Sequence, residues 1–269
     1  MRAQALQALR HTDPLEKTAA VRALSGLDAG AVLPEAGACR LALDTGAVLP
    51  EPEGLPGRPE RPQLVSPKLL KPRPVHTLEG RASLLHALAH IEFNAINLAL
   101  DIIWRFPGMP EDFYIDWLKV AQEEARHYLL LAEHLQSLGY AYGDFPAHDG
   151  LWEMALRTRG DLLARLALVP RTLEARGLDA SPPIRAKLAQ AGDMRAAAIL
   201  DIILHDEIGH VAIGNHWYRY ACAQSGKDPE LAYQEMVRVY RAPVPRGPFN
   251  MEARRQAGFT ESELVALAG

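Results

Sequence analysis

The sequence has few cysteines, few aromatic residues and no long hydrophobic run. Its two cysteines, Cys39 and Cys222, stand far apart among 269 residues and form no Cys-x-x-Cys pair, which excludes zinc ribbons and thioredoxin-type chemistry. One disulfide remains open, but a reducing compartment is the simpler interpretation. No apolar run approaches the ~20 residues of a membrane span, and the first residues do not resemble a secretory signal. We therefore expect a cytoplasmic protein with no membrane partner.

A strong excess of charge is also missing. The formal net charge is −4 at pH 7 and the pI is near 6.2, so nothing draws the whole molecule to nucleic acid. Hydrophobic residues make up 48% of the chain and charged residues 23%, which is sufficient for a packed core. The length suits one large domain or two small ones.

Strand patterns are nearly absent, and the N-terminal third combines short helices with a proline-rich arm. Two short helices are predicted over 3–9 and 14–24, the second with Asp13 as N-cap and Pro14 as first helical residue. Eight of the 20 prolines fall between Pro50 and Pro74, which excludes a long helix or a central strand there. We interpret this stretch as an extended, mildly basic arm, either lying over the helices or forming a solvated linker. A nucleic-acid contact is the alternative.

Long helical periodicity begins near residue 76. Four helices with short connections are predicted over 77–105, 111–138, 151–176 and 193–224. A helix of ~28 residues is about 40 Å long, and four such helices favour an all-α four-helix bundle. Gly139 and Gly177 are the predicted C-caps of the second and third helices. The expected domains are short helices and arm over 1–75, a bundle over 76–226, and a tail over 227–269 with short helices near 229–240 and 262–268.

Acidic residues and histidines interrupt the apolar faces of these helices at mid-length. Glu124 and His127 do so in the second helix, and Glu207 and His210 in the fourth. Three residues turn a helix by about 300°, so both members of each pair share one face. Glu92 has the same position in the first helix. A buried carboxylate is costly unless it is paired or binds a metal, and no Lys or Arg occupies these faces nearby, so the pattern predicts metal ions.

The spacing of these acids repeats. Glu92 precedes Glu124 by 32 residues and Glu174 precedes Glu207 by 33, so the chain contains a Glu followed by Glu-x-x-His twice. This is the ligand set of di-iron and di-manganese carboxylate bundles. Four carboxylates and two imidazoles suit two iron ions, and less uniquely manganese. The predicted metal ligands are Glu92, Glu124, His127, Glu174, Glu207 and His210.

The assignment of Glu174 as a ligand rests mainly on this spacing, because Pro170 disturbs the helical periodicity just before it. Glu153 and Asp161 in the same predicted helix are its rivals. For the whole set, core His–Glu hydrogen bonds without a metal are the alternative interpretation.

Three further residues are predicted around the ligands. Ligating histidines usually donate their second N–H to a carboxylate or carbonyl. Glu123 and Asp206 immediately precede Glu124 and Glu207, and each could reach a histidine on the partner helix; ordinary pairing between helices or at the surface is the other interpretation. Tyr128 lies on the inner face, where it either packs in the core or bonds a ligand and takes part in redox chemistry.

Three stretches of the sequence carry a family resemblance. His90-Ile-Glu-Phe-Asn94, the segment from Pro170 to Asp179, and His205-Asp-Glu-Ile-Gly-His-Val211 resemble a bacterial ferritin-like family of undefined function, which is similar to the di-iron tRNA-modifying hydroxylase MiaE. The resemblance covers about residues 76–225. It implies a ferritin-like four-helix bundle with a di-metal site and, often, O₂ chemistry. It implies no particular substrate.

Several functions are compatible with this pattern. The first hypothesis is a non-haem di-iron oxidase or monooxygenase that uses O₂ or peroxide, an electron donor and an unknown small-molecule substrate. An iron-handling ferroxidase or storage protein is the second, and its assembly as a homo-oligomer would distinguish it. A manganese catalase-type peroxide scavenger, a tRNA-modifying hydroxylase with an RNA substrate, and a binding module with a vestigial site remain open.

Overall fold

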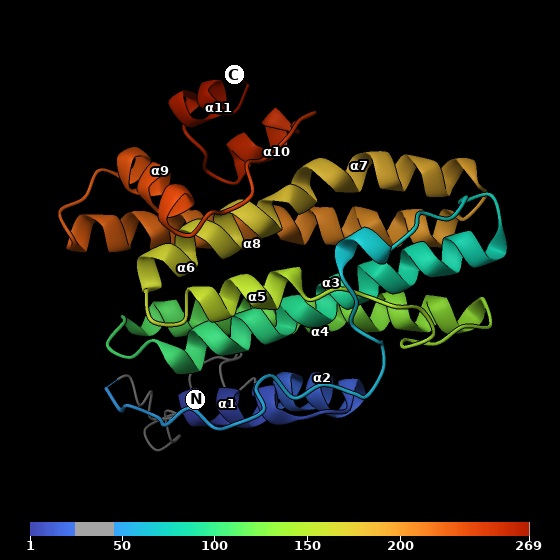
Figure 1. Ribbon diagram of the computed structural model, residues 1–269, viewed down its shortest axis with the longest axis horizontal. Coiled ribbons are helices and arrows are strands. Elements are labelled where there is room, and N and C mark those ends of the chain that lie inside the picture. The colour runs from blue at the N-terminus through green and yellow to red at the C-terminus, as the bar shows by residue number, and fades with distance from the viewer. Residues whose placement is uncertain (25–45, 269) are drawn as a thin grey trace, which may run out of the picture.

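A computed structural model describes residues 1–24 and 46–268, and helices dominate this part of the chain (Figure 1). The predicted all-α class is confirmed, because the described residues contain no strand and only an isolated bridge between Leu64 and Ala147. The long helices are α3 (Leu78–Arg105), α4 (Glu111–Ser137), α7 (Ala175–Gln190) and α8 (Met194–Gln224). The shorter elements are α1 (Arg2–Arg10), α2 (Pro14–Ala23), the 3-10 turn η1 (Pro67–Leu69), α5 (Gly150–Arg157), α6 (Leu162–Leu168), the π-helical turn η2 (Val169–Glu174), α9 (Pro229–Val239), α10 (Met251–Gln256) and α11 (Glu261–Ala268).

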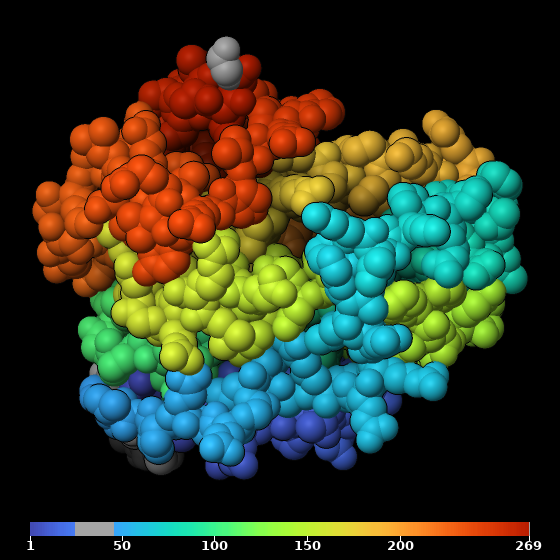
Figure 2. All heavy atoms as spheres, in the orientation of Figure 1, coloured from blue at the N-terminus to red at the C-terminus, as the bar shows by residue number. Residues whose placement is uncertain are grey.

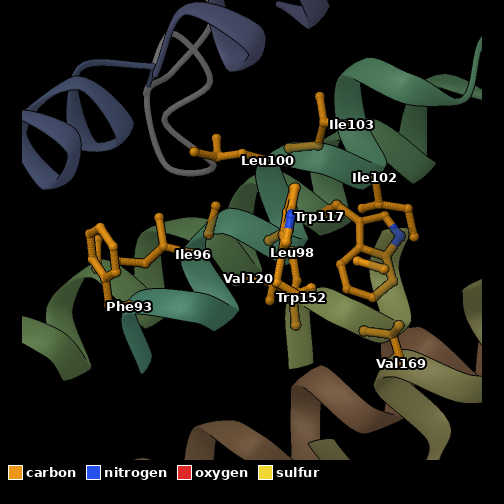
Figure 3. Packing of buried hydrophobic residues seen from close by; sticks show 14 of the residues in the cluster. Phe93, Ile96, Leu98, Leu100, Ile102, Ile103, Trp117, Val120, Trp152 and Val169 are labelled. Atoms are coloured by element: carbon orange, nitrogen blue, oxygen red, sulfur yellow. The ribbon is translucent and has the colours of Figure 1, made fainter. Parts of the chain in front are cut away.

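The helices are arranged in successive layers. Figure 1 shows α3, α4 and α5 side by side, with α6, α7 and α8 forming the neighbouring layer. α1 and α2 pack against the outer side of α3 and α4, and α9 to α11 lie on the opposite side of the molecule. Apolar side chains fill the spaces between layers. Figure 3 shows part of this apolar cluster, in which Ile96 and Leu98 of α3 are packed together with Trp117 and Val120 of α4 and Trp152 of α5, all of them buried.

The predicted ends of three long helices agree with the structure to within one residue. Thr77 caps α3, because its Oγ1 accepts a hydrogen bond from the Gly80 N–H at 3.0 Å. Asp193 caps α8 in the same way through Ala196, at 3.0 Å. Gly139 follows α4 with φ of +82°, a left-handed conformation that glycine adopts without strain.

The predicted single helix over 151–176 is wrong. α5 stops at Arg157, and Asp161 then begins α6 by accepting a hydrogen bond from the Ala164 N–H at 2.9 Å. Pro170 lacks an N–H, and the chain widens there into the π-helical turn η2. Gly177 is not a C-cap, because α7 continues through it and through Pro182 and Pro183. In the tail, α9 and α11 were expected, whereas α10 was not.

The N-terminal segment and the arm pack on the helical core. Lys17 of α2 is buried, and its ammonium donates to Leu9 O at 3.1 Å, Gly57 O at 2.7 Å and Asn97 Oδ1 at 2.5 Å. One side chain therefore joins α1, the arm and α3. Arg58 of the arm pairs with Asp149 at 2.6 Å, and Figure 2 shows the arm, light blue to cyan, lying along the surface beside α5. The arm therefore lies over the helices and is not a free linker, and the alternative of a nucleic-acid contact stays a prediction.

Two further sequence predictions concern membrane spans and the cysteines. No helix among the described residues combines the length and apolar character needed to cross a membrane. Cys222 is a buried free thiol, and Cys39 lies outside the described residues.

Candidate metal centre

Three helices bring five of the predicted ligands together. Glu92 comes from α3, Glu124 and His127 from α4, and Glu207 and His210 from α8; each is at most 7% exposed. They form two groups, in each of which ligand atoms of all members lie within 4.8 Å of one another. We call Glu92, Glu124 and His127 the first Glu–His group, and Glu124, Glu207 and His210 the second. Glu124 belongs to both.

Each histidine directs its Nδ1 atom toward the carboxylates. His127 Nδ1 lies 3.3 Å from Glu92 Oε2 and 3.4 Å from Glu124 Oε2. His210 Nδ1 lies 2.9 Å from Glu124 Oε1 and 3.9 Å from Glu207 Oε1. The two oxygens of Glu124 therefore face different histidines, whose ring centroids are 5.8 Å apart.

The opposite nitrogens of the two rings are held crosswise between α4 and α8. His127 Nε2 on α4 donates to Asp206 Oδ2 on α8 at 3.0 Å, and His210 Nε2 on α8 donates to Glu123 Oε2 on α4 at 2.9 Å. In each case the acceptor directly precedes the glutamate of the other helix's Glu-x-x-His pair. These bonds fix the ring orientation and leave Nδ1 pointing into the centre.

Glu174 lies near the second Glu–His group but outside both groups. It is the last residue of η2, and its Oε2 atom is buried. Burial raises the pKa of its carboxyl well above the usual range, and the nearby charges of Glu207 and Glu124 raise it further. Its rivals are placed elsewhere: Glu153 is exposed, and Asp161 caps α6.

All six predicted ligands carry a buried side-chain atom that makes no hydrogen bond within the described chain. These atoms are Glu92 Oε2, Glu124 Oε2, His127 Nδ1, Glu174 Oε2, Glu207 Oε2 and His210 Nδ1. An unsatisfied buried polar group costs about 1–3 kcal/mol and is rare in native proteins. Six of them converging on one region, with the oxygen and imidazole donors that iron and manganese prefer, fit a metal centre.

Without a metal, protons balance the charge of this region. Burial and the neighbouring Glu124 carboxylate raise the pKa of Glu92, and the same causes raise that of Glu207. Burial disfavours a charged imidazole at His127, but the adjacent carboxylates of Glu124 and Glu92 outweigh it and raise the pKa to about 11. Burial also disfavours a charged imidazole at His210, but the Glu124 carboxylate outweighs it and raises the pKa of His210 well above the usual range. A metal ion that bound here would therefore have to displace protons.

We expect metal affinity to rise with pH. The pKa of His127 is raised from about 6.5 in the unfolded chain to about 11, so its stabilisation of the metal-free protein is complete below pH 6.5 and is lost as pH approaches 11. Over the same range Mn²⁺ should bind about tenfold tighter per pH unit for each proton displaced. Competition with a chelator between pH 6.5 and 8.5, alongside thermal unfolding of the metal-free protein, measures both effects. An affinity that falls with pH would contradict this balance.

Tyr128 packs in an aromatic cluster beside the centre. Its ring lies 5.6 Å from that of Phe93 and 5.3 Å from that of Tyr142, measured between centroids. The Tyr142 hydroxyl is 2.8 Å from His90 Nδ1.

Two residues near the site are not predicted from the sequence: Tyr142, and Arg171, a buried arginine three residues before Glu174. The only sequence signal for Arg171 is its occurrence directly after the apolar run that ends at Pro170.

Comparison with known sequences gives a family. The profile of a family described as "Protein of unknown function (DUF455)" matches residues 10–265, which include all six predicted ligands. The chain belongs to the DUF455 family. A protein of Haemophilus influenzae described as "Uncharacterized protein" is 54% identical over 213 residues, covering 77% of this chain and 74% of that protein. No solved structure matches the chain. Membership in a family of undefined function agrees with that part of the expected resemblance and brings no activity with it; the ferritin-like and MiaE-like parts stay predictions.

Proposed function

We propose that this chain is a ferritin-like di-iron carboxylate protein that carries out O₂-dependent oxidation of a substrate still to be identified. The observation that carries the proposal is the convergence of six unsatisfied buried donor atoms from α3, α4, η2 and α8. The crosswise bonds from His127 and His210 support it, because they direct both Nδ1 atoms inward. The ferritin-like comparison rests on two helix pairs, α3 with α4 and η2–α7 with α8, each supplying one Glu and one Glu-x-x-His.

The ligands divide naturally between two ions. Glu92 and His127 would hold one, Glu207 and His210 the other with Glu174, and Glu124 would serve both. Four carboxylates balance two divalent ions, so the loaded centre would be neutral without bound protons. When bound, two iron ions supply the binding and reduction of O₂.

The protein's own contribution is orientation and exclusion of water. With metal bound, Asp206 and Glu123 would keep the imidazoles in one tautomer, with the proton on Nε2 and the lone pair on Nδ1. Lys119 and Arg126 lie behind these two acids, at 4.0 Å and 3.6 Å, and offset their charge. The burial of the five central side chains keeps bulk water from the donor atoms.

Metal content of the purified protein tests the proposal. We expect about two iron ions per chain in the wild type, none in the Glu124→Ala, Glu207→Ala double variant, and two in Glu133→Ala, a control on the exposed face of α4. The iron-loaded wild type should also consume O₂ when a chemical reductant is supplied. Two manganese ions with peroxide turnover would favour the catalase alternative. Absence of bound metal after anaerobic reconstitution with Fe²⁺ would refute a metal centre of either kind.

A further inference from the structure

The turn η2 contacts two different parts of the molecule. Glu174, at its end, lies in the electrostatic field of Glu207 and Glu124. Arg171, one turn earlier, is 3% exposed and has its partners elsewhere. Its guanidinium donates to Asn215 Oδ1 of α8 at 2.6 Å and forms a close ion pair with Glu263 of α11. One short turn thus joins the metal centre to the C-terminal helices.

The guanidinium of Arg171 is enclosed by aromatic rings as well. The centroids of Tyr218, Tyr233 and Phe259 lie 4.8 to 5.2 Å from its central carbon. Tyr233 belongs to α9, and Phe259 lies between α10 and α11. A buried arginine with a carboxylate partner and stacked rings has little freedom to move, so the tail holds η2 firmly at this residue.

Both carboxylate oxygens of Glu263 also accept hydrogen bonds. It closes a capping box at the start of α11, in which its Oε2 accepts from the Thr260 N–H at 2.8 Å and Thr260 Oγ1 accepts from the Glu263 N–H at 3.3 Å. Its other oxygen, Oε1, accepts a hydrogen bond from the Arg171 guanidinium. The same carboxylate therefore begins the last helix and anchors η2.

The turn needs such support, because its own backbone ladder is interrupted. Pro170 has no N–H to donate, and Thr172 Oγ1 donates to the Ala167 carbonyl, five residues back, at 2.8 Å. α8 approaches closely at Gly214, where a Cβ atom would lie 2.6 Å from Pro170 Cβ. The position of Glu174 thus depends on side-chain contacts to other elements.

We infer that the Arg171–Glu263 contact is a positioning device, through which the C-terminal tail places Glu174 to complete the site of the second metal ion. The inference rests on the proposed di-metal function. It predicts an asymmetry between the two ions. The first Glu–His group is built from α3 and α4 alone, whereas the second is the one that Glu174 adjoins.

The variant Glu263→Gln tests this device in the full-length protein. It keeps the shape of the side chain and removes the negative charge that Arg171 contacts. Anaerobic titration with Fe²⁺, followed by counting bound ions after gel filtration at several free-metal concentrations, should show one ion bound as in the wild type and the second at least tenfold weaker. Glu261→Gln is the matched control, because Glu261 forms an exposed pair with Arg255 within the same tail, and it should bind both ions as the wild type does.

A second variant separates positioning from loss of stability. Thr260→Ala removes the threonine side of the capping box and leaves the Arg171–Glu263 pair, so it should lower the melting temperature without changing the affinity for the second ion. If Glu263→Gln does not yield folded protein, Glu263→Asp, which withdraws the carboxylate by one methylene, replaces it with the same expectation.

The outcomes distinguish the inference from the function on which it rests. Equal weakening of both ions in Glu263→Gln, or unchanged binding of both, would overturn the positioning role while the di-metal centre stands. Loss of the second ion in Thr260→Ala to the same degree would overturn it too. A wild-type protein that binds no metal would instead refute the proposed function itself.

Discussion

Replacing Glu124 by glutamine is expected to weaken binding of both metal ions by more than about 100-fold, whereas Glu92→Gln should affect one. Glu124 alone belongs to both Glu–His groups, and its two oxygens face His210 and His127 separately. Loss of residues that only orient a ligand already costs 10- to 100-fold in metal affinity, and loss of a shared ligand should cost more. Chelator competition with Mn²⁺ or Fe²⁺ measures both affinities.

The control for this experiment lies on the same helix. Glu133 pairs with Arg195 at 2.6 Å, and both side chains are exposed, so Glu133→Gln should bind two ions normally. A Glu124→Gln protein that keeps one tightly bound ion would show that the carboxylate serves a single site. The division of ligands between the ions would then need to be redrawn.

Replacing Asp101 by asparagine is expected to lower the free energy of unfolding by about 3–5 kcal/mol. Asp101 of α3 is fully buried and accepts hydrogen bonds from Arg105 at 2.8 Å and from the buried Arg165 of α6. Removing one partner of a buried ion pair leaves an uncompensated charge, which is the costly case. Here one carboxylate serves two guanidinium groups. Urea denaturation of the metal-free protein measures the loss.

Asp201→Asn provides the comparison. Asp201 pairs with Arg185 at 2.9 Å, but its side chain is 56% exposed, and exposed pairs contribute about 0–1 kcal/mol. Equal losses in the two variants would mean that the Asp101 network is solvated in solution or that the two arginines find other partners.

The parts of the fold that the sequence predicts well are those decided locally. α3, α4 and α8 have long apolar periodicity and a local stop or start signal, such as Thr77, Asp193 or Gly139, and their ends follow from these. The third predicted helix fails because Asp161 and Pro170 act against a periodicity that continues past them. Whether Pro170 kinks, ends or widens a helix depends on what packs on it, and the close approach of α8 at Gly214 is not visible in the sequence around Pro170.

The candidate site divides in the same way. Glu92, the two Glu-x-x-His pairs and the acids before them lie at mid-length on regular helices, so helical geometry alone indicates which residues meet. Glu174 follows an irregular turn, and its exact reach depends on Arg171. The partners of Arg171 come from residues 44 and 92 positions further along the chain. No local sequence pattern predicts contacts between residues so far apart in the chain.

The crosswise bonds between α4 and α8 have a consequence for folding specificity. A purely apolar seam between two long helices tolerates a slip by one turn, because one leucine contact resembles the next. Here a slip of one turn, about 5.4 Å, would leave Asp206 and Glu123 without their histidines, and buried polar groups unpaired. A single mid-helix polar layer can select one alignment in this way, as buried asparagine does in coiled coils. The residues that orient the two histidines thus also encode the register in which α4 and α8 meet.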